Sequence, residues 1–585
     1  MKKNHKQQRE FKVLSDQLVQ IKEIVNNTKA ANLWSHEAAL RKKIKSLMQI
    51  KDKHLKDFHE VYTAYKELLD DVSLRLLEDY NERNETNYTF EDIIKGQEAH
   101  YLNSGIIAVL MTSHIPALVA DEFRRYFPQN PKDEYQAART LKRKIYLHLG
   151  ETNTGKTYNA ICRLKESKKG VYLAPLRILA LEIFERLNKQ GIKCSLRTGE
   201  EEVLIEDACH VSSTVEKLNL NEDYDVAVID EIQMIGDAQR GAAWTRAVLG
   251  LRCKEIHICG AFNAKALLLK IIKDCDDDYE IKEYVRNTPL VVMDKSFHLK
   301  AIEKGDALVV FSKKRVLELA KYYLEQGIKA SIIYGDLPPE VRRMQYQAFI
   351  NGENSILIAT DAIGMGVNLP IRRILFMNIK KFDGDEVRFL TSQEVKQIAG
   401  RAGRKGIYDT GYAGSIGNNR FIKENLEIPD DWIYEAVVGP SEALLKITQL
   451  PLREKLALWS TREESLNYFR KMDVRDYLLI LDHIKKYKLK ESDQWKLMKL
   501  PFDVEQEELL QCLLHYTKEY FIKRKDVLCK PHLIEEHLEA LEVYYQKINL
   551  YYSFSKNFGL DFDEQWVYES RSKISEKINT LLIKL

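Results

Sequence analysis

Short apolar runs rich in β-branched residues alternate with helical segments from about residue 144 onwards, and this alternation restricts the fold more than any other feature. Runs of this length are typical of buried strands, and the helices between them return the chain across the sheet. The pattern predicts parallel sheets covered on both faces, in two successive α/β domains joined near residue 300. The first series is Ile145–Leu149, Val171–Leu173, Val226–Ile229 and Ile256–Cys259, and the second is Ala307–Phe311, Ser331–Tyr334, Ile356–Ala359 and Ile374–Met377.

Helical periodicity flanks the two series. Before residue 140, apolar residues such as Leu40, Ile44 and Leu47 recur at three- and four-residue steps with Lys and Glu between them. The chain becomes helical again beyond residue 425. Because 585 residues exceed what one hydrophobic core accommodates, several domains are expected. The prediction is a helical N-terminal domain (residues 1–140), two α/β domains (141–298 and 299–425) and a helical C-terminal domain (426–585).

Composition is that of an ordinary folded protein, with 45% hydrophobic and 30% charged residues and a formal net charge of +3. This near balance neither favours nor excludes a polyanionic partner, so nucleic acid would have to bind a local basic groove. No apolar run approaches the roughly 20 residues of a membrane span, so no membrane association is predicted. The eight cysteines form no Cys-x-x-Cys pair, and the basic N-terminus has no apolar segment behind it. We therefore expect a cytoplasmic protein with reduced thiols.

A glycine-rich loop follows the first predicted strand and fits the pattern Gly-x-x-x-x-Gly-Lys-Thr. Between a strand and a helix, the backbone N–H groups of such a loop and the helix N-terminus converge on phosphate oxygens. We expect Lys156 to reach the β- and γ-phosphates of ATP, and Thr157 to ligate Mg²⁺. The predicted phosphate-binding loop is Gly150, Glu151, Thr152, Asn153, Thr154, Gly155, Lys156 and Thr157.

The predicted strand Val226–Ile229 ends in two carboxylates. Asp230 is expected to hold Mg²⁺ through its water shell, and Glu231 to accept a proton from the water that attacks the γ-phosphate. An Asp-Glu pair alone is more typical of a surface turn, but this pair follows a phosphate-binding loop. Both motifs together predict an ATPase. Many kinases, exporters and motors share them, so they do not identify a helicase.

A motif with two arginines lies in the second α/β domain, Gln397-Ile398-Ala399-Gly400-Arg401-Ala402-Gly403-Arg404. Its two arginines are three residues apart on one face of a helix, with Gln397 one turn before Arg401. An arginine supplied across a domain interface stabilises the charge that develops on the transferred phosphoryl group. Arg401 and Arg404 are therefore predicted to complete the ATP site. Upstream, a buried strand leads into the polar, glycine-rich loop Thr360–Pro370, which is suited to face nucleotide and nucleic-acid backbone.

Together these segments resemble motifs I, II, V and VI of superfamily 2 helicases, in the usual order. Finer details are similar to one family, the RNA helicase of the mitochondrial degradosome and its bacterial relatives. The likeness covers roughly residues 143 to 416, and a milder one continues into Pro451–Lys455. One departure is Cys259-Gly260-Ala261, which stands where many RNA helicases have Ser-Ala-Thr. The segments that carry the likeness are Ala174–Ala180, Arg197–Glu200, Asp230–Gln233, Tyr334–Pro339 and Gln397–Arg404.

The resemblance implies two RecA-like domains flanked by helical regions, and an enzyme that uses ATP and Mg²⁺ to translocate and unwind from a 3′ single-stranded tail. It favours RNA over DNA as the substrate and leaves an exoribonuclease open as a protein partner. Carried over residue by residue, it implies that Gln397 meets the nucleotide from the second domain, together with Arg401 and Arg404, and that Asp361 lies near the ribose. The side chains implied to contact phosphates and sugars, without reading base sequence, are Arg177, Thr198, Thr214, Ser312 and Thr360.

The segment Ile379–Leu390 is predicted to form a β-hairpin, because Asp383-Gly384 stands between two alternating apolar-polar runs. One interpretation is a wedge that parts the duplex, with Phe382 or Phe389 stacked on the terminal base pair. An equally good interpretation is an edge hairpin that completes the second sheet.

Several further interpretations stay open at the level of sequence. Hydroxyls near strand ends are common helix caps, which is an equally good interpretation of Thr214 and Ser312. A DNA helicase, a protein-moving motor and a remodelling switch that separates no strands share the same two-domain engine. Motifs that grip the backbone do not distinguish RNA from DNA, and no glutamine motif for reading adenine precedes the phosphate-binding loop.

Overall fold

A computed structural model shows the chain as two compact units, residues 1–126 with 446–462, and residues 127–445 with 463–585. The structure describes residues 2–50, 55–84, 87–114, 117–286, 288–364, 369–383, 386–404, 406–448, 450–462 and 464–584. Each unit contains its own hydrophobic core.

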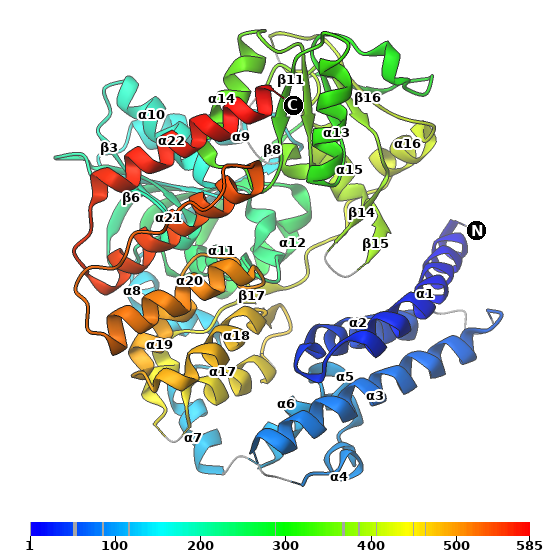
Figure 1. The fold of residues 1–585 in the computed structure, drawn as a ribbon, viewed down its shortest axis with the longest axis vertical. Coiled ribbons are helices and arrows are strands. Elements are labelled where there is room, and N and C mark those ends of the chain that lie inside the picture. Colours follow the sequence, from blue (N-terminus) through cyan, green and yellow to red (C-terminus); the bar gives the residue numbers. More distant parts are fainter. Residues whose placement is uncertain are drawn as a thin grey trace. The chain divides into compact units, whose positions relative to one another are not determined.

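The first unit is helical throughout its described part, and α2 packs along α3 (Figure 1). The apolar residues whose spacing predicted helices form its core, where Leu40, Ile44, Tyr65 and Val72 are fully buried. The side chain of Thr89 caps α4 by accepting the backbone N–H of Asp92. The helices are α1 (Lys2–Asn27), η1 (Ala30–Asn32), α2 (Trp34–Gln49), α3 (Phe58–Asn84), α4 (Phe90–Ile94), α5 (Glu98–Ser104), α6 (Ile106–His114), α7 (Ala117–Tyr126) and α17 (Leu452–Thr461).

Eight strands form the first sheet of the second unit, in the order β4-β3-β5-β2-β6-β7-β1-β8. All neighbours pair in parallel except β3 and β4, which are antiparallel. The four strands predicted from apolar runs are β1, β2, β6 and β7, which lie side by side in the sheet. The strands are β1 (Lys144–Gly150), β2 (Gly170–Ala174), β3 (Cys194–Arg197), β4 (Glu202–Val203), β5 (His210–Thr214), β6 (Asp223–Ile229), β7 (Arg252–Gly260) and β8 (Asp278–Tyr284).

Helices cover both faces of this sheet. Alternate residues of β2 enter different cores: Leu173 packs with residues of α11 and α12, whereas Tyr172 packs with residues of α9 and α10. This division explains why the central strands are apolar on both sides. The helices of this region are η2 (Pro131–Glu134), α8 (Gln136–Arg139), α9 (Lys156–Lys165), α10 (Arg177–Lys189), η3 (Val215–Lys217), η4 (Ile232–Gly236), α11 (Gly241–Gly250), η5 (Phe262–Ala264) and α12 (Lys265–Asp274).

Six parallel strands form the second sheet, in the order β11-β12-β10-β13-β16-β9. With it, the prediction of two parallel α/β domains of the RecA-like type is confirmed. Its strands are β9 (Leu290–Val292), β10 (Asp306–Val309), β11 (Ala330–Ile333), β12 (Ile356–Ala359), β13 (Arg373–Phe376) and β16 (Gly411–Ser415). Its helices are η6 (Leu299–Ala301), α13 (Lys313–Leu324), α14 (Pro339–Ile350), η7 (Asp361–Gly364), α15 (Ser392–Ala399) and α16 (Asn419–Glu427).

The predicted hairpin is present as β14 (Lys380–Phe382) and β15 (Val387–Phe389), which pair antiparallel. The two strands form a sheet of their own (Figure 1), so the interpretation as an edge that completes the second sheet is wrong. Two predicted features lie partly outside the described residues: the Asp383-Gly384 turn, of which Gly384 is not described, and the glycine-rich loop Thr360–Pro370, of which positions 365–368 are not.

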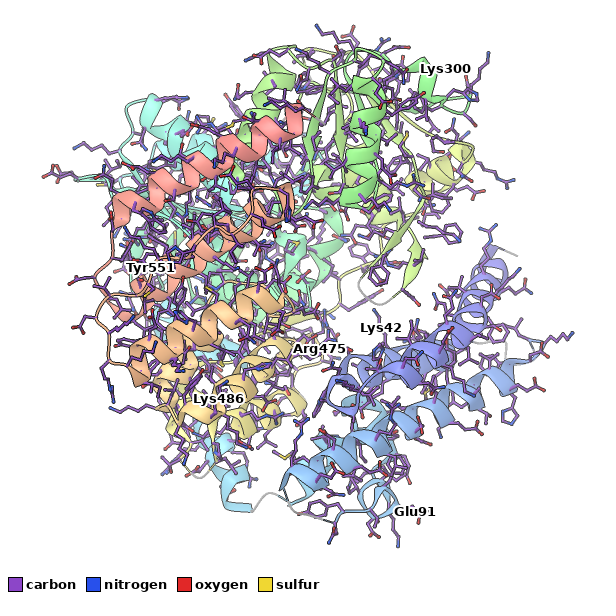
Figure 2. The ribbon with its side chains drawn as sticks, viewed as in Figure 1. Lys42, Glu91, Lys300, Arg475, Lys486 and Tyr551 are labelled. Carbon is purple, nitrogen blue, oxygen red and sulfur yellow. The ribbon has the colours of Figure 1, made fainter. Side chains whose placement is uncertain are left out.

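The C-terminal region is mainly helical, as expected, but it also contains a short parallel pair of strands. Ala436 and Val438 of β17, with Phe469 of β18, join the core of the first sheet. Further along, Tyr551 lies among aromatic side chains of the last helices, with its ring centroid 5.5 Å from that of Trp566 (Figure 2). The elements are β17 (Ala436–Val438), η8 (Glu442–Lys446), β18 (Phe469–Lys471), α18 (Arg475–Ile484), η9 (Lys485–Tyr487), α19 (Glu491–Met498), α20 (Glu507–Thr517), the π-helix η10 (Lys518–Ile522), α21 (Leu538–Phe558) and α22 (Glu564–Ile583).

Candidate active site

The predicted phosphate-binding loop joins β1 to the N-terminus of α9, as such a loop requires. Gly155 has a φ of +84° and Asn153 a φ of +63°, so the loop turns through the left-handed region just before the helix begins. The ammonium group of Lys156 donates to the backbone carbonyls of Gly150, at 2.8 Å, and of Glu151. Burial lowers the pKa of Lys156. The lysine is thus held against its own loop, in a position to exchange these carbonyl oxygens for others.

The carboxylate of Asp230 follows β6 and faces the start of α9. Its Oδ1 accepts the hydroxyl of Thr157 at 3.0 Å, and its Oδ2 accepts the hydroxyl of Tyr172 at 2.9 Å. Burial raises the pKa of Asp230 to about 6, and the adjacent charge of Glu231 contributes to the rise. Two oxygen-bearing side chains therefore meet where a nucleotide-bound cation would lie.

These donors fit Mg²⁺. Hard oxygen ligands suit this ion, and in nucleotide sites one or two protein groups suffice because water and phosphates complete the coordination. The part of the chain that the structure describes holds no cluster of three or more His, Cys, Asp or Glu side chains suited to a metal ion. A site built from Thr157 and Asp230 would depend on a bound nucleotide for its remaining ligands.

The carboxylate of Glu231 is held by a residue to which the sequence assigned no role. Gln233 donates from Nε2 to Glu231, and its Oε1 accepts the backbone N–H of Ala261 at 3.1 Å. A Cβ added at Gly260 would lie 2.6 Å from Oε1 of Gln233 and 2.9 Å from the backbone nitrogen of Ile232, so any other residue there would displace them. Gln233 therefore connects the predicted catalytic base to the segment after β7, where this chain departs from the Ser-Ala-Thr of many RNA helicases.

The arginine motif of the second sheet meets the phosphate-binding loop of the first. Asn153 donates from Nδ2 to the carbonyl of Gly403 at 3.1 Å. A Cβ added at Gly400 would lie 1.9 Å from Oγ1 of Thr152, so the two segments approach as closely as glycine permits. Arg401 donates from Nε to the carbonyl of Gly364 at 3.0 Å. The two motifs, about 250 residues apart in sequence, are in direct contact.

One cavity of about 670 Å³ brings most of the predicted ATP-site residues together. It is lined by the whole of the loop 150–157, by Asp230 and Glu231, and by Gln397 and Arg401 from the second sheet. Two residues that were predicted to belong to the ATP site, Arg404 and Asp361, do not line this cavity. Arg404 lies near Glu182, which does line the cavity. Burial raises the pKa of Glu182, and the positive charge of Arg404 opposes that rise. The carboxylate of Asp361 accepts the ammonium group of Lys381 at 3.0 Å.

Arg286, in the connection between the two sheets, also lines the cavity and was missed in the sequence. Its Nη1 donates to the carbonyl of Gly400 at 2.8 Å, and its Nε to that of Thr288 at 2.6 Å. No local pattern marks a lone arginine of this kind. Its contacts place a positive charge beside the arginine motif.

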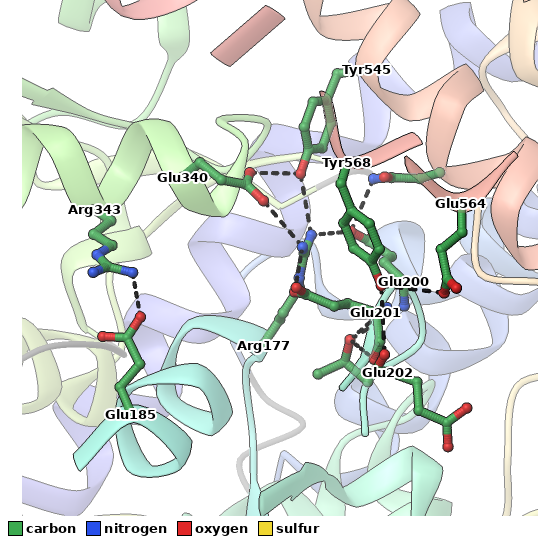
Figure 3. A network of polar contacts seen from close by, with 12 residues as sticks. Arg177, Glu185, Glu200, Glu201, Glu202, Glu340, Arg343, Tyr545, Glu564 and Tyr568 are labelled. Carbon is green, nitrogen blue, oxygen red and sulfur yellow. Dashed lines mark hydrogen bonds and ion pairs between the residues drawn. The ribbon is translucent and has the colours of Figure 1, made fainter. Parts of the chain in front are cut away.

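Arg177, expected to contact nucleic acid, is surrounded by the protein's own acidic side chains (Figure 3). Its guanidinium group donates to Glu200 at 2.7 Å, to Glu201 at 3.0 Å and to Glu340 at 3.1 Å. Nη1 also donates to the hydroxyl of Tyr545 at 3.2 Å. Its side chain is 11% exposed. Among the described residues, both terminal nitrogens of this arginine thus have partners, which no single stretch of sequence contains, whereas its buried Nε has none.

The four hydroxyl residues expected to contact nucleic acid differ in their surroundings. Ser312 caps α13 by accepting the backbone N–H of Arg315, so the capping interpretation describes its present contact. Thr214 makes no such capping bond, although it precedes η3. Thr198 donates to the carbonyl of Glu201 at 3.0 Å, and Oγ1 of Thr360 accepts the backbone N–H of Ala362 at 3.3 Å. Contact of any of them with nucleic acid stays a prediction.

Comparison with protein families gives three matching stretches. The "DEXQ-box helicase domain of Suv3" matches residues 131–284, the "Helicase conserved C-terminal domain" matches residues 292–406, and the "ATP-dependent RNA helicase SUV3 C-terminal domain" matches residues 538–584. The matches follow the order of the two sheets and the last two helices.

Among known proteins, the chain is 39% identical over 394 residues to ATP-dependent RNA helicase SUV3L, mitochondrial, of Oryza sativa subsp. japonica, covering 65% of this chain and 52% of that protein. It is 35% identical over 474 residues to DExH-box ATP-dependent RNA helicase DExH16, mitochondrial, of Arabidopsis thaliana (76% of this chain, 81% of that protein). It is 34% identical over 453 residues to ATP-dependent RNA helicase SUV3, mitochondrial, of Oryza sativa subsp. japonica (72% and 76%). The chain spans about half the length of several relatives that it matches, between 47% and 52%.

These relatives contradict one prediction. Their names place them in mitochondria, so the expectation of a cytoplasmic protein is wrong. That expectation was based on cysteine usage and N-terminal composition, which are indirect indicators of compartment. Of the helices in the described ranges, none combines the length and apolar character needed to cross a membrane.

Proposed function

Because the chain belongs to the SUV3 family of ATP-dependent RNA helicases, we propose that it hydrolyses ATP to move along single-stranded nucleic acid from 3′ to 5′ and to unwind RNA duplexes. One observation carries the proposal: a single cavity is lined by the loop 150–157 and Glu231 from the first sheet and by Gln397 and Arg401 from the second. A nucleotide held by both sheets would tie their closure to binding and their separation to hydrolysis.

The chemistry assigned to these residues is phosphoryl transfer to water. Lys156 exchanges the carbonyls of Gly150 and Glu151 for the β- and γ-phosphate oxygens, helped by the backbone N–H groups of the loop. Glu231, oriented by Gln233, accepts a proton from the attacking water. This orientation matters because a base must lie within hydrogen-bond reach of the proton it removes.

The second sheet supplies positive charge. Gln397, Arg401 and Arg404 act on the γ-phosphoryl group, where negative charge builds up during transfer. Arg401 gives up its bond to the carbonyl of Gly364 for this purpose. Asp361, which now accepts Lys381, is assigned to the ribose by family resemblance.

Mg²⁺ is the second cofactor in the proposal. Thr157 and Asp230 would hold it, and when bound it supplies neutralising charge to the phosphates. The contact between Thr157 and Asp230 supports this assignment, because the two oxygens are already 3.0 Å apart.

Nucleic acid is proposed to lie along the ends of strands and helices that carry Arg177, Thr198, Thr214, Ser312 and Thr360. RNA is favoured because the relatives are named RNA helicases. We also propose an exoribonuclease as a partner. The proposed domains are residues 1–140, 141–298, 299–425 and 426–585. The segment 446–462, which clusters with residues 1–126, argues for revising the last of these limits.

The test compares ATPase stimulation and strand displacement on 3′- and 5′-tailed RNA and DNA duplexes. We expect 3′-tailed RNA to be displaced, and Glu231→Gln to bind ATP without displacing any duplex. Stimulated hydrolysis without displacement would favour a remodelling switch, and preference for DNA tails would favour a DNA helicase. Substantial turnover by Glu231→Gln would remove the role given to that residue.

A further inference from the structure

The cluster around Arg177 joins three parts of the second unit. We call Arg177, Glu200, Glu201, Glu340 and Tyr545 the Arg177 cluster (Figure 3). Arg177 begins α10 beside the first sheet, and the two neighbouring glutamates lie between β3 and β4. Glu340 lies in the first turn of α14, beside the second sheet, and Tyr545 lies on α21. One guanidinium group is therefore bonded to residues beside the first sheet, beside the second sheet and on a C-terminal helix.

The contact across the two sheets is reinforced by the tyrosine. The hydroxyl of Tyr545 donates to Oε2 of Glu340 at 2.6 Å and accepts Nη1 of Arg177 at 3.2 Å. Arg177 reaches the other oxygen of the same carboxylate, Oε1 of Glu340, at 3.1 Å. Both oxygens of Glu340 are thus engaged, and Tyr545 itself is buried, with only 3% of its surface exposed.

A guanidinium group binds a carboxylate and a phosphate in the same way, through planar N–H donors that match two oxygens. The three carboxylates and the hydroxyl of Tyr545 occupy the four N–H groups of Nη1 and Nη2, and the remaining Nε–H is buried, so no pair of N–H groups is open to a phosphodiester. The acidic side chains also repel an approaching phosphate. Nucleic acid that uses Arg177 must therefore displace at least one of them.

Glu340 is the carboxylate whose displacement has consequences beyond the cluster. Glu200 and Glu201 lie beside the first sheet, as Arg177 does, so losing either leaves the contact with α14 of the second sheet in place. Glu200 is also held by Nδ2 of Asn549 at 2.9 Å. Losing Glu340 breaks one of the ion pairs between α10, beside the first sheet, and α14, beside the second.

We propose that Glu340 is an internal phosphate mimic, which occupies Arg177 in the absence of nucleic acid and is displaced by a backbone phosphate when a strand binds. This inference rests on the proposed function, because it takes Arg177 to be a nucleic-acid contact. Occupation by Glu340 lowers the apparent affinity for nucleic acid, because only the molecules in which Arg177 is free of Glu340 are competent to bind. Displacement releases the contact between the sheets, so strand binding and domain movement become coupled.

The test is the affinity of the full-length chain for a fluorescein-labelled single-stranded oligouridylate, measured by anisotropy without nucleotide. Glu340→Gln keeps the shape of the side chain but removes its charge. We expect it to bind about three- to tenfold more tightly at low salt, with a smaller gain at high salt. Arg177→Gln is expected to bind more weakly, and the double variant to bind like Arg177→Gln, because the gain requires the arginine.

A matched control exists on the same two helices. Glu185 of α10 pairs with Arg343 of α14 across the same pair of sheets (Figure 3) but has no bond to Arg177. Glu185→Gln therefore removes a similar ion pair and is expected to leave the affinity unchanged. Tyr545→Phe is a milder second variant that keeps the ring. Because it removes the hydroxyl that holds Glu340, it is expected to tighten binding as well.

The inference is overturned if both Glu340→Gln and Tyr545→Phe bind as wild type or more weakly, if the gain persists without Arg177, or if Glu185→Gln gives the same gain. The proposed function can fail separately. If the wild-type protein binds RNA and the variants show the expected gains, but the wild-type protein displaces no duplex, the phosphate-mimic inference stands and the proposed helicase function is wrong. Wild-type protein that does not bind the oligouridylate overturns both.

Discussion

Thr157 donates its hydroxyl hydrogen to Oδ1 of Asp230 at 3.0 Å, so the two residues assigned to Mg²⁺ touch each other across the start of α9 and the end of β6. Because both supply oxygen to the same point, we expect Thr157→Ala to lower the ATPase kcat by about 10²-fold, equal to about 2.7 kcal/mol of transition-state stabilisation. The Mg²⁺ concentration at half-maximal rate should rise as well. Steady-state hydrolysis over a Mg²⁺ titration measures both. Thr140→Ala, which removes a hydroxyl bonded to the carbonyl of Ala137, serves as the control. An unchanged Mg²⁺ requirement in Thr157→Ala would refute the assignment.

Gly400 tests the contact between the two sheets. A methyl group there would lie 1.9 Å from Oγ1 of Thr152 and 2.7 Å from the carbonyl oxygen of Lys396, so Gly400→Ala forces the arginine motif, the side chain of Thr152 or both to shift. We expect kcat for ATP hydrolysis to fall about tenfold, since misplacing a catalytic group by about 1 Å has large effects on rate. Binding of a fluorescent ATP analogue should change little, because the loop itself is intact.

The control for Gly400→Ala is Gly335→Ala, where an added Cβ meets nothing within 4 Å. Gly335 lies between β11 and α14, beside the same sheet as Gly400, so the variant also replaces a glycine by alanine but creates no close contact. Wild-type turnover by Gly400→Ala would mean that hydrolysis does not need this close approach.

The central strands were predictable because they are buried on both faces, which makes them almost continuously apolar. β5 was not predicted, because it is buried without being apolar. All of its residues are buried, yet it reads His-Val-Ser-Ser-Thr. Its serine hydroxyls are satisfied by backbone carbonyls, as in Ser212, which donates to Ala180 at 2.6 Å. β8 lies at an edge and is mostly exposed, so it carries no apolar run.

The same distinction applies to the site. The loop 150–157 and the pair Asp230-Glu231 are contiguous, so their spacing marks them. Arg286 and the partners of Arg177 come from elements far apart in the chain, and only the fold brings them together. The link from Gln233 to Ala261 crosses 28 residues and depends on where two strands end in one sheet. No periodicity or motif encodes such contacts.

The hairpin carries a prediction about unwinding. Phe382 and Val387 face each other across β14 and β15, and they are 60% and 63% exposed. An exposed aromatic ring of this kind is suited to stack on a base pair. Phe382→Ala is expected to slow strand displacement several-fold while RNA-stimulated ATPase stays near wild type. Ile534→Ala, at an 86% exposed position away from the hairpin, is the control. Unchanged displacement by Phe382→Ala would exclude a wedge role for this ring.

Glu394 anchors that hairpin to α15, and its acidity gives a prediction about pH. Its carboxylate accepts both Nη1 and Nη2 of Arg388 at 2.9 Å and lies 2.7 Å from the ammonium group of Lys381. Burial raises the pKa of Glu394, but the hydrogen bonds from Arg388 and Lys381 outweigh burial and lower it to about 2, from 4.5. Because the folded-state pKa is lowered, this contribution to stability is fully present above pH 4.5 and is lost as the pH falls towards 2.

We therefore expect Glu394→Gln to lower the free energy of unfolding at pH 7, by about 3 kcal/mol at most for a pKa change from 4.5 to about 2. The difference from wild type should shrink steadily between about pH 5 and pH 3, because the wild-type carboxylate becomes protonated in the unfolded chain first. Thermal unfolding of both proteins across this range measures it. Glu424→Gln, which breaks an exposed pair with Arg420, is expected to cost little at any pH. A difference between Glu394→Gln and wild type that does not vary with pH would mean that charge on Glu394 is not what stabilises the anchor.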